Sequence, residues 1–305
     1  MGLAAKRRGG LQGAASASEE MLVPDTPTAI GNAAQIDYWN ATAGEIWATY
    51  QTLLDRQIEP LGEEAMRVLA PRIGERIIDI GCGCGQSTIA LAERVGESGA
   101  VVGADISRPM LDIARARPVP EGAAHPDFRE SDVQSAELEE GAFDAGFSRF
   151  GVMFFADPVV AFRNIHMALK PGGRLAFVCW RPFPENIWMR APMEAAAPFL
   201  TPSPPPDPAA PGPFAFADAG RVRAILADAG FQDVAIEPFD ARIGGGTVEE
   251  TMELAFRVGP LGAALRENPD AVDKVAHAVH LALRSFDTPN GVLAPAAVWI
   301  VTARA

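Results

Sequence analysis

The segment RIIDIGCGCGQSTIA, residues 76–90, places the tightest constraint on the fold. A short apolar run at 76–80 leads into glycines at every second position, Gly81, Gly83 and Gly85, and a helical pattern begins at residue 86. A glycine loop between a strand and a helix lets the backbone approach a ligand closely, and the start of the helix presents free N–H groups. The segment therefore predicts an α/β fold that holds a ligand on its backbone at the carboxyl end of a strand.

The rest of the chain repeats this order of strand and helix. Strands are predicted at 76–80, 100–104, 127–131, 143–147, 174–180, 234–237 and 297–303, helices at 86–95, 109–117, 159–169 and 221–229, and a turn at 171–173. Strands that alternate with helices across short loops favour a parallel sheet covered on both faces. The carboxyl ends of these strands are expected to gather the functional site.

Four regions lie outside this rhythm. Residues 1–34 are expected to be a disordered tail, and 35–305 a single domain whose cofactor-binding part is 70–180. The pattern at 36–69 is helical, and Pro60 is expected to divide it into two helices. The stretches 181–216, which is rich in proline and expected to form a surface loop, and 242–290, which is helical in pattern, are interpreted as insertions. Whether they cover the substrate site as lids or only decorate the surface stays open.

Composition excludes several classes of function. A net charge of −13 over 305 residues, with a pI near 4.8, opposes binding to the phosphate backbone of nucleic acids. Three cysteines, two of them in one tight loop, cannot form a disulfide framework, so a reducing cytoplasm is expected. No run approaches the ~20 apolar residues of a membrane span, and none follows the early basic residues as in a secretory signal. The chain is expected to be a cytoplasmic protein with a small-molecule ligand.

Two carboxylates narrow the identity of that ligand. Asp105 ends the second predicted strand, 20 residues past Gly85, where a carboxylate can bind both hydroxyls of a ribose. The spacing G-x-G-x-G differs from the nicotinamide fingerprint G-x-G-x-x-G. Asp79, two residues before the first glycine, would repel a pyrophosphate and attract an ammonium or sulfonium group. These features favour a cationic cofactor, with a nicotinamide-dependent oxidoreductase as the alternative.

Five motifs together resemble the class I S-adenosylmethionine-dependent methyltransferases, in particular the small-molecule group that includes the ubiquinone and menaquinone biosynthesis methyltransferases. The motifs are IIDIGCGCG (77–85), VVGADIS (101–107), ESDVQ (130–134), FDAGFSRFGVMFF (143–155) and LKPGGRLAFV (169–178). The resemblance implies a Rossmann-like, seven-stranded, mostly parallel sheet with helices on both faces and an antiparallel last strand. It also implies S-adenosyl-L-methionine as the cofactor and transfer of a methyl group to an oxygen or carbon of a small molecule.

The resemblance carries roles to individual positions. Asp79 would hold the methionyl amine, directly or through water, and Asp105 the ribose. The loop of Gly81, Cys82, Gly83 and Gly85 would pass under the cofactor. Ile106, Asp132 and Val133 would surround the adenine, and Ser148 and Arg149 would line the sulfonium. The residues expected to line the substrate are Tyr38, Trp39, Tyr50, Phe150 and Met153.

The cysteines and histidines give weaker evidence for a metal site or a catalytic group. Cys82 and Cys84 supply at most half of a tetrahedral zinc site, so they are interpreted as small fillers and no metal is expected. Candidates for a catalytic group are His277, His280 and Arg149, and a packed or solvated helical role stays open for both histidines. A non-catalytic cofactor-binding regulatory protein is a further alternative. The sequence leaves open whether the chain forms a homodimer.

Overall fold

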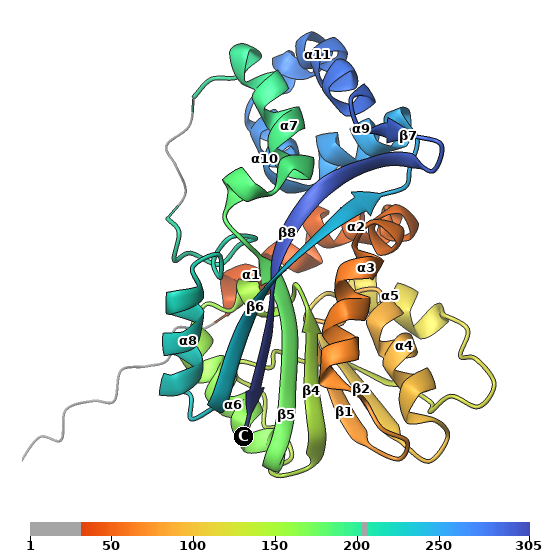
Figure 1. Cartoon of the computed structure of the whole chain (residues 1–305), viewed down its shortest axis with the longest axis vertical. Coiled ribbons are helices and arrows are strands. Elements are labelled where there is room, and N and C mark those ends of the chain that lie inside the picture. Colours follow the sequence, from red (N-terminus) through yellow and green to blue (C-terminus); the bar gives the residue numbers. More distant parts are fainter. Residues whose placement is uncertain (1–31, 203–206) are drawn as a thin grey trace, which may run out of the picture.

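A single twisted sheet forms the centre of the molecule, in a computed structural model that describes residues 32–202 and 207–305 (Figure 1). Its main path has the order β3-β2-β1-β4-β5-β8-β6. The strands are β1 Arg76–Ile80, β2 Ala100–Asp105, β3 Asp127–Glu130, β4 Phe143–Arg149, β5 Leu169–Trp180, β6 Gln232–Gly244, β7 Asp287–Thr288 and β8 Gly291–Arg304. Strands β1 to β5 pair in parallel, and β8 runs antiparallel between β5 and β6.

The predicted α/β class, the mostly parallel sheet and the antiparallel last strand are confirmed. The predicted number of seven strands is wrong by one, because β7 pairs with β8 as an eighth strand. Two residues are too few to leave an alternating pattern in a sequence. Strand β5 also begins earlier than expected and includes the predicted turn at 171–173. The carboxyl-terminal residue holds that turn in the sheet, since the Gly172 N–H donates to Ala305 O at 2.8 Å.

Helices cover both faces of the sheet, as predicted. The chain moves outward in one direction from β1 to β3 and in the other from β4 to β5, so right-handed crossovers place their helices on opposite faces. The helices are α1 Ala33–Asn40, α2 Thr42–Thr49, α3 Gln51–Leu69, α4 Gln86–Val95, α5 Arg108–Ala116, α6 Pro158–Ala168, α7 Ile187–Ala196, α8 Ala219–Asp228, α9 Val248–Arg257, α10 Gly259–Glu267 and α11 Val272–Arg284. None of the helices in the described part of the chain has the length and apolarity of a membrane span.

The helices before β1 differ from the prediction. Residues 32–75 form three helices, separated at Ala41 and Tyr50, and α3 continues through Pro60. Proline removes one helical hydrogen bond. Helix α3 tolerates this because its opposite face is buried in the core of the sheet through Ile58, Leu61 and Ala65. The predicted tail at 1–34 lies outside the described residues except at its end, where α1 begins.

Four helices form a cap beyond the carboxyl ends of the strands. Helices α7, α9, α10 and α11 pack on one another around a separate hydrophobic cluster that includes Val275 and Val279 (top of Figure 1). Strands β6 and β8 are long, at 13 and 14 residues, and reach up to the cap. The segment 181–216 was expected to be a loop, yet it supplies α7, in which Pro192 is buried. The helical pattern at 242–290 is confirmed as α9 to α11.

Candidate functional site

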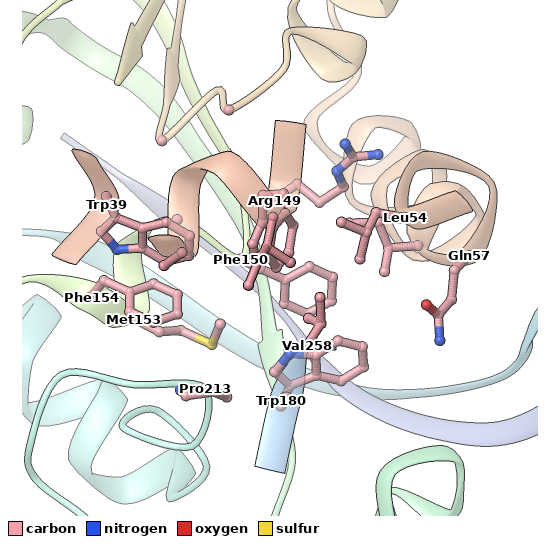
Figure 2. A pocket seen from close by; sticks show the side chains of 18 of the residues that line it. Trp39, Leu54, Gln57, Arg149, Phe150, Met153, Phe154, Trp180, Pro213 and Val258 are labelled. Carbon is pink, nitrogen blue, oxygen red and sulfur yellow. The ribbon is translucent and has the colours of Figure 1, made fainter. Parts of the chain in front are cut away.

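One cavity of about 670 Å³ extends from the carboxyl ends of the strands to the underside of the cap (Figure 2). This volume is typical of a small-molecule site. Helices α1 to α3 form one side of it, and the loop after β4 and the end of β5 form another. The predicted residues that line the cavity are Gly81, Gly83, Asp105, Ile106, Asp132, Val133 and Arg149, together with Tyr38, Trp39, Phe150 and Met153.

The glycine loop lies in close backbone contact with its surroundings. Gly81 has a φ of +66°, and a Cβ atom there would lie 2.7 Å from the Cα of Gly151. Gly85 has a φ of +81°, and its Cβ would meet the Cβ of Ala114 at 2.8 Å. Any side chain at these positions would be strained in its backbone and would also clash. The loop is therefore held against the segment after β4 by contacts that only glycine allows.

Asp79 lies behind this loop and lines neither the large cavity nor a smaller one beside Cys82 and Cys84. It is fully buried, and its Oδ2 accepts hydrogen bonds from Ser87 Oγ at 2.7 Å and Thr88 Oγ1 at 2.6 Å, while Oδ1 has no partner. Burial raises the pKa of this carboxyl to about 6. The side chain thus ties the loop to the start of α4 and carries an unpaired oxygen within the protein.

Asp105 ends β2 at the wall of the cavity. Its Oδ2 accepts from the Gly83 N–H at 2.7 Å, and its Oδ1 accepts from the Ser107 N–H at 2.8 Å. Burial raises the pKa of this carboxyl, and hydrogen bonds from the backbone of Ser107, Gly83 and Ile106 oppose that rise. Each oxygen keeps a second lone pair, so the carboxylate fixes the loop and can still accept from hydroxyl groups in the cavity.

The ends of β2 and β3 are joined to the first helix. Asn32 donates from Nδ2 to Asp132 Oδ1 at 3.1 Å, and Asn40 donates from Nδ2 to Ile106 O at 2.7 Å. Asp132 also accepts from the Gln134 N–H and from Ser135 Oγ. Helix α1 therefore closes over the two strand ends where Ile106 and Val133 line the cavity.

A second cavity of about 50 Å³ adjoins the glycine loop. Arg149, at the end of β4, lines both cavities with a side chain that is 10% exposed. Its guanidinium donates to Asp55 Oδ1 at 3.3 Å and to Gln86, and Asp55 also pairs with Arg117. Burial lowers the pKa of Arg149 and the Asp55 carboxylate opposes that change. A cation and an anion therefore lie side by side where the two cavities meet.

Aromatic side chains form the other walls of the large cavity. Phe150 has a φ of +62°, a conformation that is rare and costly for a bulky residue. This backbone places its ring flat on Trp180, with centroids 4.1 Å apart and planes 11° apart. Trp188 on α7 follows with its centroid 5.1 Å from that of Trp180. On the opposite side, Trp39 contacts Phe154 edge-on at 5.0 Å (Figure 2).

Several predicted site residues lie outside the lining of both cavities. Ser148 is buried behind the loop and donates to Ile80 O at 2.7 Å. Tyr50 donates to Glu253 on α9 at 2.7 Å, so it joins the amino-terminal helices to the cap. His277 is exposed on α11, and His280 faces Glu249 at 3.6 Å. Gly85 is the N-cap residue of α4. The structure gives none of these side chains access to the cavity.

Other lining residues were not among those predicted. They include Asn32, Asp55, Gln57, Trp180 and Trp188, with Val258 and Arg257 from the cap. Gln57 could have been identified from the sequence, because it interrupts the apolar helical face formed by Leu54, Ile58 and Leu61. Trp180 could also have been identified, because it is the last residue of a buried strand. The cap residues could not, since only the packing of distant segments brings them to the cavity.

The cysteines are buried and unlinked. Burial raises the pKa of the Cys82 thiol and raises that of Cys84 to about 12, so neither is a ready nucleophile at neutral pH. Cys82 and Cys84 line the smaller cavity beside the loop. Within residues 32–202 and 207–305, no three His, Cys, Asp or Glu side chains are grouped as metal ligands would be.

Comparisons with known proteins agree with this architecture. Residues 77–173 match the model of a family described as "Methyltransferase domain". The sequence is 32% identical over 130 residues to aklanonic acid methyltransferase DauC of Streptomyces sp. strain C5, an alignment that covers 43% of this chain and 59% of that protein. It is 33% identical over 115 residues to demethylmenaquinone methyltransferase of Lactococcus lactis, covering 38% and 46%. The chain thus spans about half the length of these relatives.

A solved structure extends the likeness beyond the matched segment. Phosphoethanolamine N-methyltransferase 2 of Haemonchus contortus, in complex with S-adenosyl-L-methionine, superimposes with a TM-score of 0.53 and 17% identity. The superposition covers 90% of this chain and 60% of that one. At this identity the match shows a shared fold. The resemblance drawn from the sequence motifs is confirmed over residues 77–173.

Proposed function

We propose that this chain transfers a methyl group from S-adenosyl-L-methionine to an oxygen or carbon of a small-molecule acceptor. One observation carries the proposal: a single cavity joins the strand ends of the methyltransferase domain to the space beneath the cap. A cofactor at the strand ends and an acceptor under the cap would share one chamber. The names of the relatives, which include methyltransferases of aklanonic acid and demethylmenaquinone, support a small-molecule acceptor.

The residues at the strand ends fit this cofactor. Asp105 offers two partly occupied carboxylate oxygens to a ribose, and Ile106 and Val133 offer apolar contact to an adenine. The glycine loop leaves no side chain between the backbone and the cavity. S-adenosylmethionine would supply a methyl group on a positively charged sulfur, which needs no metal for its transfer.

The smaller cavity fits the amino-acid end of the cofactor. Arg149 and Asp55 present opposite charges there, as an α-carboxylate and an α-ammonium require. Asp79 was predicted to hold the amine, but its side chain faces Ser87 and Thr88 behind the loop. We propose that Asp55 contacts the amine of the cofactor. Asp79 then acts indirectly, because it fixes the glycine loop and its negative charge favours a cationic cofactor.

The large cavity offers no evident general base. Among the described residues that line it, there is no His, Lys, Cys or Glu, and its two aspartates, Asp105 and Asp132, already accept hydrogen bonds at the cofactor end. Its one tyrosine, Tyr38, is 48% exposed on α1. Deprotonation of a neutral aliphatic alcohol would need such a base. We propose that the acceptor ionises by itself, as a phenol, enol or carboxylic acid does. The protein then aligns the nucleophile and excludes water.

Ligand titration tests the cofactor assignment. S-adenosylhomocysteine should raise the melting temperature of the full chain, by the equivalent of about 2.7 kcal/mol at a hundredfold excess over its dissociation constant. NAD and NADP should have no effect. The melting temperature of the Asp105→Ala variant should no longer rise with S-adenosylhomocysteine. The control is Asp287→Ala, at an exposed position outside the cavity, and its melting temperature should rise as that of the original protein does. Stabilisation by NAD or NADP without any by S-adenosylhomocysteine would establish the nicotinamide alternative instead.

Turnover separates catalysis from binding. The protein should release S-adenosylhomocysteine when supplied with S-adenosylmethionine and a panel of phenolic, enolic and carboxylic compounds. Tight cofactor binding without turnover across that panel would favour the non-catalytic regulatory alternative.

The finer predictions on partners and location remain proposals. The net charge of −13 supports a protein that does not bind nucleic acid. A cytoplasmic location rests on the three unpaired cysteines. Sedimentation at micromolar concentration would decide between a monomer and a homodimer.

A further inference from the structure

An arginine outside both cavities holds the charged pair that lines the smaller one. Arg117 is the C-cap residue of α5, its side chain is 22% exposed, and it lines neither cavity. Its guanidinium donates to Cys84 O, to Gln51 Oε1 at 2.6 Å and to Asp55 Oδ2. These oxygens belong to the glycine loop and to the first turns of α3. The proposed methyl transfer uses Asp55 and Arg149 but assigns nothing to Arg117.

The Asp55 carboxylate lies between two guanidinium groups. Its Oδ2 accepts from Arg117, and its Oδ1 accepts from Arg149 at 3.3 Å. The side chain of Asp55 is 14% exposed and that of Arg149 is 10% exposed, so water and salt screen these charges weakly. Asp55 therefore has one oxygen engaged by each arginine.

The contact of Asp55 with Arg149 is weak because Arg117 takes the other oxygen. An arginine and a carboxylate that are free to pair form two parallel hydrogen bonds. Such a fork would engage both oxygens of Asp55 and close the pair across the smaller cavity. With Oδ2 held by Arg117, only one hydrogen bond to Arg149 remains, and its 3.3 Å exceeds the usual range of about 2.7–3.2 Å. A ligand with an ammonium and a carboxylate group can displace a contact of this kind.

Two neutral oxygens fix the guanidinium of Arg117 in turn. Cys84 O accepts from its Nε, and Gln51 Oε1 accepts from its Nη2. The planar group cannot turn away from Asp55 without losing these hydrogen bonds. Gln51 and Asp55 are four residues apart on α3, so they share one face of the helix, and both line the smaller cavity.

Resting on the proposed function, we infer that Arg117 is a positioning residue for the amino-acid end of the cofactor. It keeps Asp55 from closing on Arg149. This leaves a carboxylate oxygen for the α-ammonium group of the cofactor and the Arg149 guanidinium for its α-carboxylate. Arg117 acts through Asp55 and takes no part in the transfer. The adenosine end of the cofactor, at Asp105 and Ile106, does not depend on it.

Two ligands that differ at the amino-acid end test this inference on the full chain. S-adenosylhomocysteine carries that end, whereas 5′-methylthioadenosine has the same adenine, ribose and thioether sulfur without it. Calorimetry at pH 7.5 measures both dissociation constants. Arg117→Met should weaken S-adenosylhomocysteine about tenfold, as expected for the loss of a hydrogen bond between charged groups, and leave 5′-methylthioadenosine within about twofold.

Arg115→Met is the matched control. Arg115 lies two residues earlier, pairs with Asp112 on the exposed side of α5 and lines neither cavity, so its loss should change neither affinity. Arg117→Lys keeps one charged donor for Asp55 and should fold even if Arg117→Met does not. It should weaken S-adenosylhomocysteine by a smaller factor and leave 5′-methylthioadenosine unchanged.

A double variant tests whether Arg117 acts through Asp55. In the Asp55→Ala background, which has already lost the contact with the ammonium group, Arg117→Met should weaken S-adenosylhomocysteine by no more than about twofold further. Full additivity of the two losses would contradict an action through Asp55.

Two further results would overturn the inference while the proposed function stands. One is unchanged affinity for both ligands in Arg117→Met. The other is equal weakening of both, as expected if Arg117 only supports the glycine loop, because Gly83 of that loop bonds to Asp105 at the ribose. A failure of the proposed function is separate, since the original protein would then bind neither ligand.

Discussion

The two ends of the cavity are built in different ways. At the strand ends, short consecutive segments place backbone amides and carboxylates around the space. The Asp105 carboxylate accepts from the Gly83 and Ser107 N–H groups, while Asn32 Oδ1 and Asp79 Oδ1 have no partner. Under the cap, the walls include residues of α3, α7, α9, α10 and the end of β5, and they are mainly apolar apart from Arg257 and Arg266. The first end is suited to one fixed ligand. The second can change its specificity by single substitutions without disturbing the first.

The largest expected effect comes from the glycine loop. Gly81→Ala should cost about 2–5 kcal/mol of unfolding free energy and abolish binding of S-adenosylhomocysteine, because the new Cβ meets the backbone of Gly151. Chemical denaturation and calorimetry would measure both. The matched control is Gly141→Ala, which has a φ of +59° and open space around its Cβ, and should cost only about 1–2 kcal/mol. Equal effects of the two substitutions would contradict the close contact.

The cap should respond separately from the strand ends. Leu265→Ala removes a side chain that is 4% exposed in the cap cluster and lines neither cavity, and it should cost about 2–5 kcal/mol. Hydrogen exchange should quicken in α10 and α11 while β1 and β4 stay protected. The affinity for S-adenosylhomocysteine should remain within about threefold of its original value.

Leu281→Ala is the control for the cap, because Leu281 is 53% exposed on α11. It should leave stability within about 0.5 kcal/mol. A tenfold loss of cofactor affinity in Leu265→Ala would show that the two ends of the cavity are not independent.

The buried carboxyl behind the loop predicts a pH dependence. The pKa of Asp79 in the folded protein is about 6, above the value of about 4 for an unfolded chain, so the folded state binds this proton more tightly. The stability that the protonated form contributes is fully present below about pH 4 and is lost as the pH rises through about 6. Asp79→Asn stays neutral and can still accept from Ser87 and Thr88.

Asp79→Asn should therefore be more stable than the original protein at pH 7.5, by at most about 3 kcal/mol, and equally stable at pH 4. Urea denaturation of the ligand-free proteins between pH 4 and 7.5 measures this difference in unfolding free energy. All other titrating groups are the same in the two proteins, so their contributions cancel in the difference. A constant difference across the range would mean that Asp79 does not titrate there.

The smallest expected effect concerns the cysteines. The double variant Cys82→Ala, Cys84→Ala should bind S-adenosylhomocysteine within about twofold of the original affinity, since both side chains act as small buried fillers. The control is Cys179→Ala, which removes a buried thiol of β5. Calorimetry measures the affinity of both variants for S-adenosylhomocysteine. A loss of a hundredfold or more in the double variant alone would give the thiols a role in binding.

The sequence predicts the first end of the cavity much better than the second. Strand β1, the loop and Asp105 follow one another within 30 residues, so local pattern suffices to place them. Even there, the partners of a side chain were not predictable: Asp79 and Ser148 lie at the expected strand positions, yet neither lines the two cavities, and they bond to Ser87 and to Ile80 O. Alternation along a strand fixes the face but not the hydrogen-bond partner.

The second end depends on contacts between distant segments. Nothing in the sequence indicates that Tyr50 pairs with Glu253, 203 residues away, or that α7 forms within a proline-rich stretch. Gln57 is an intermediate case, since a polar residue on an apolar helical face was visible but its cavity was not. Tertiary packing decides such positions, and local propensity does not.

A crystal structure of the full chain with S-adenosylhomocysteine would test the two-ended cavity most directly. We expect the adenine beside Ile106 and Val133, the ribose hydroxyls on Asp105 and the amino-acid tail against Arg149 and Asp55. The space bounded by Gln57, Trp180 and Trp188 should remain free beyond the sulfur. A cofactor that extends under the cap and fills that space would contradict this account.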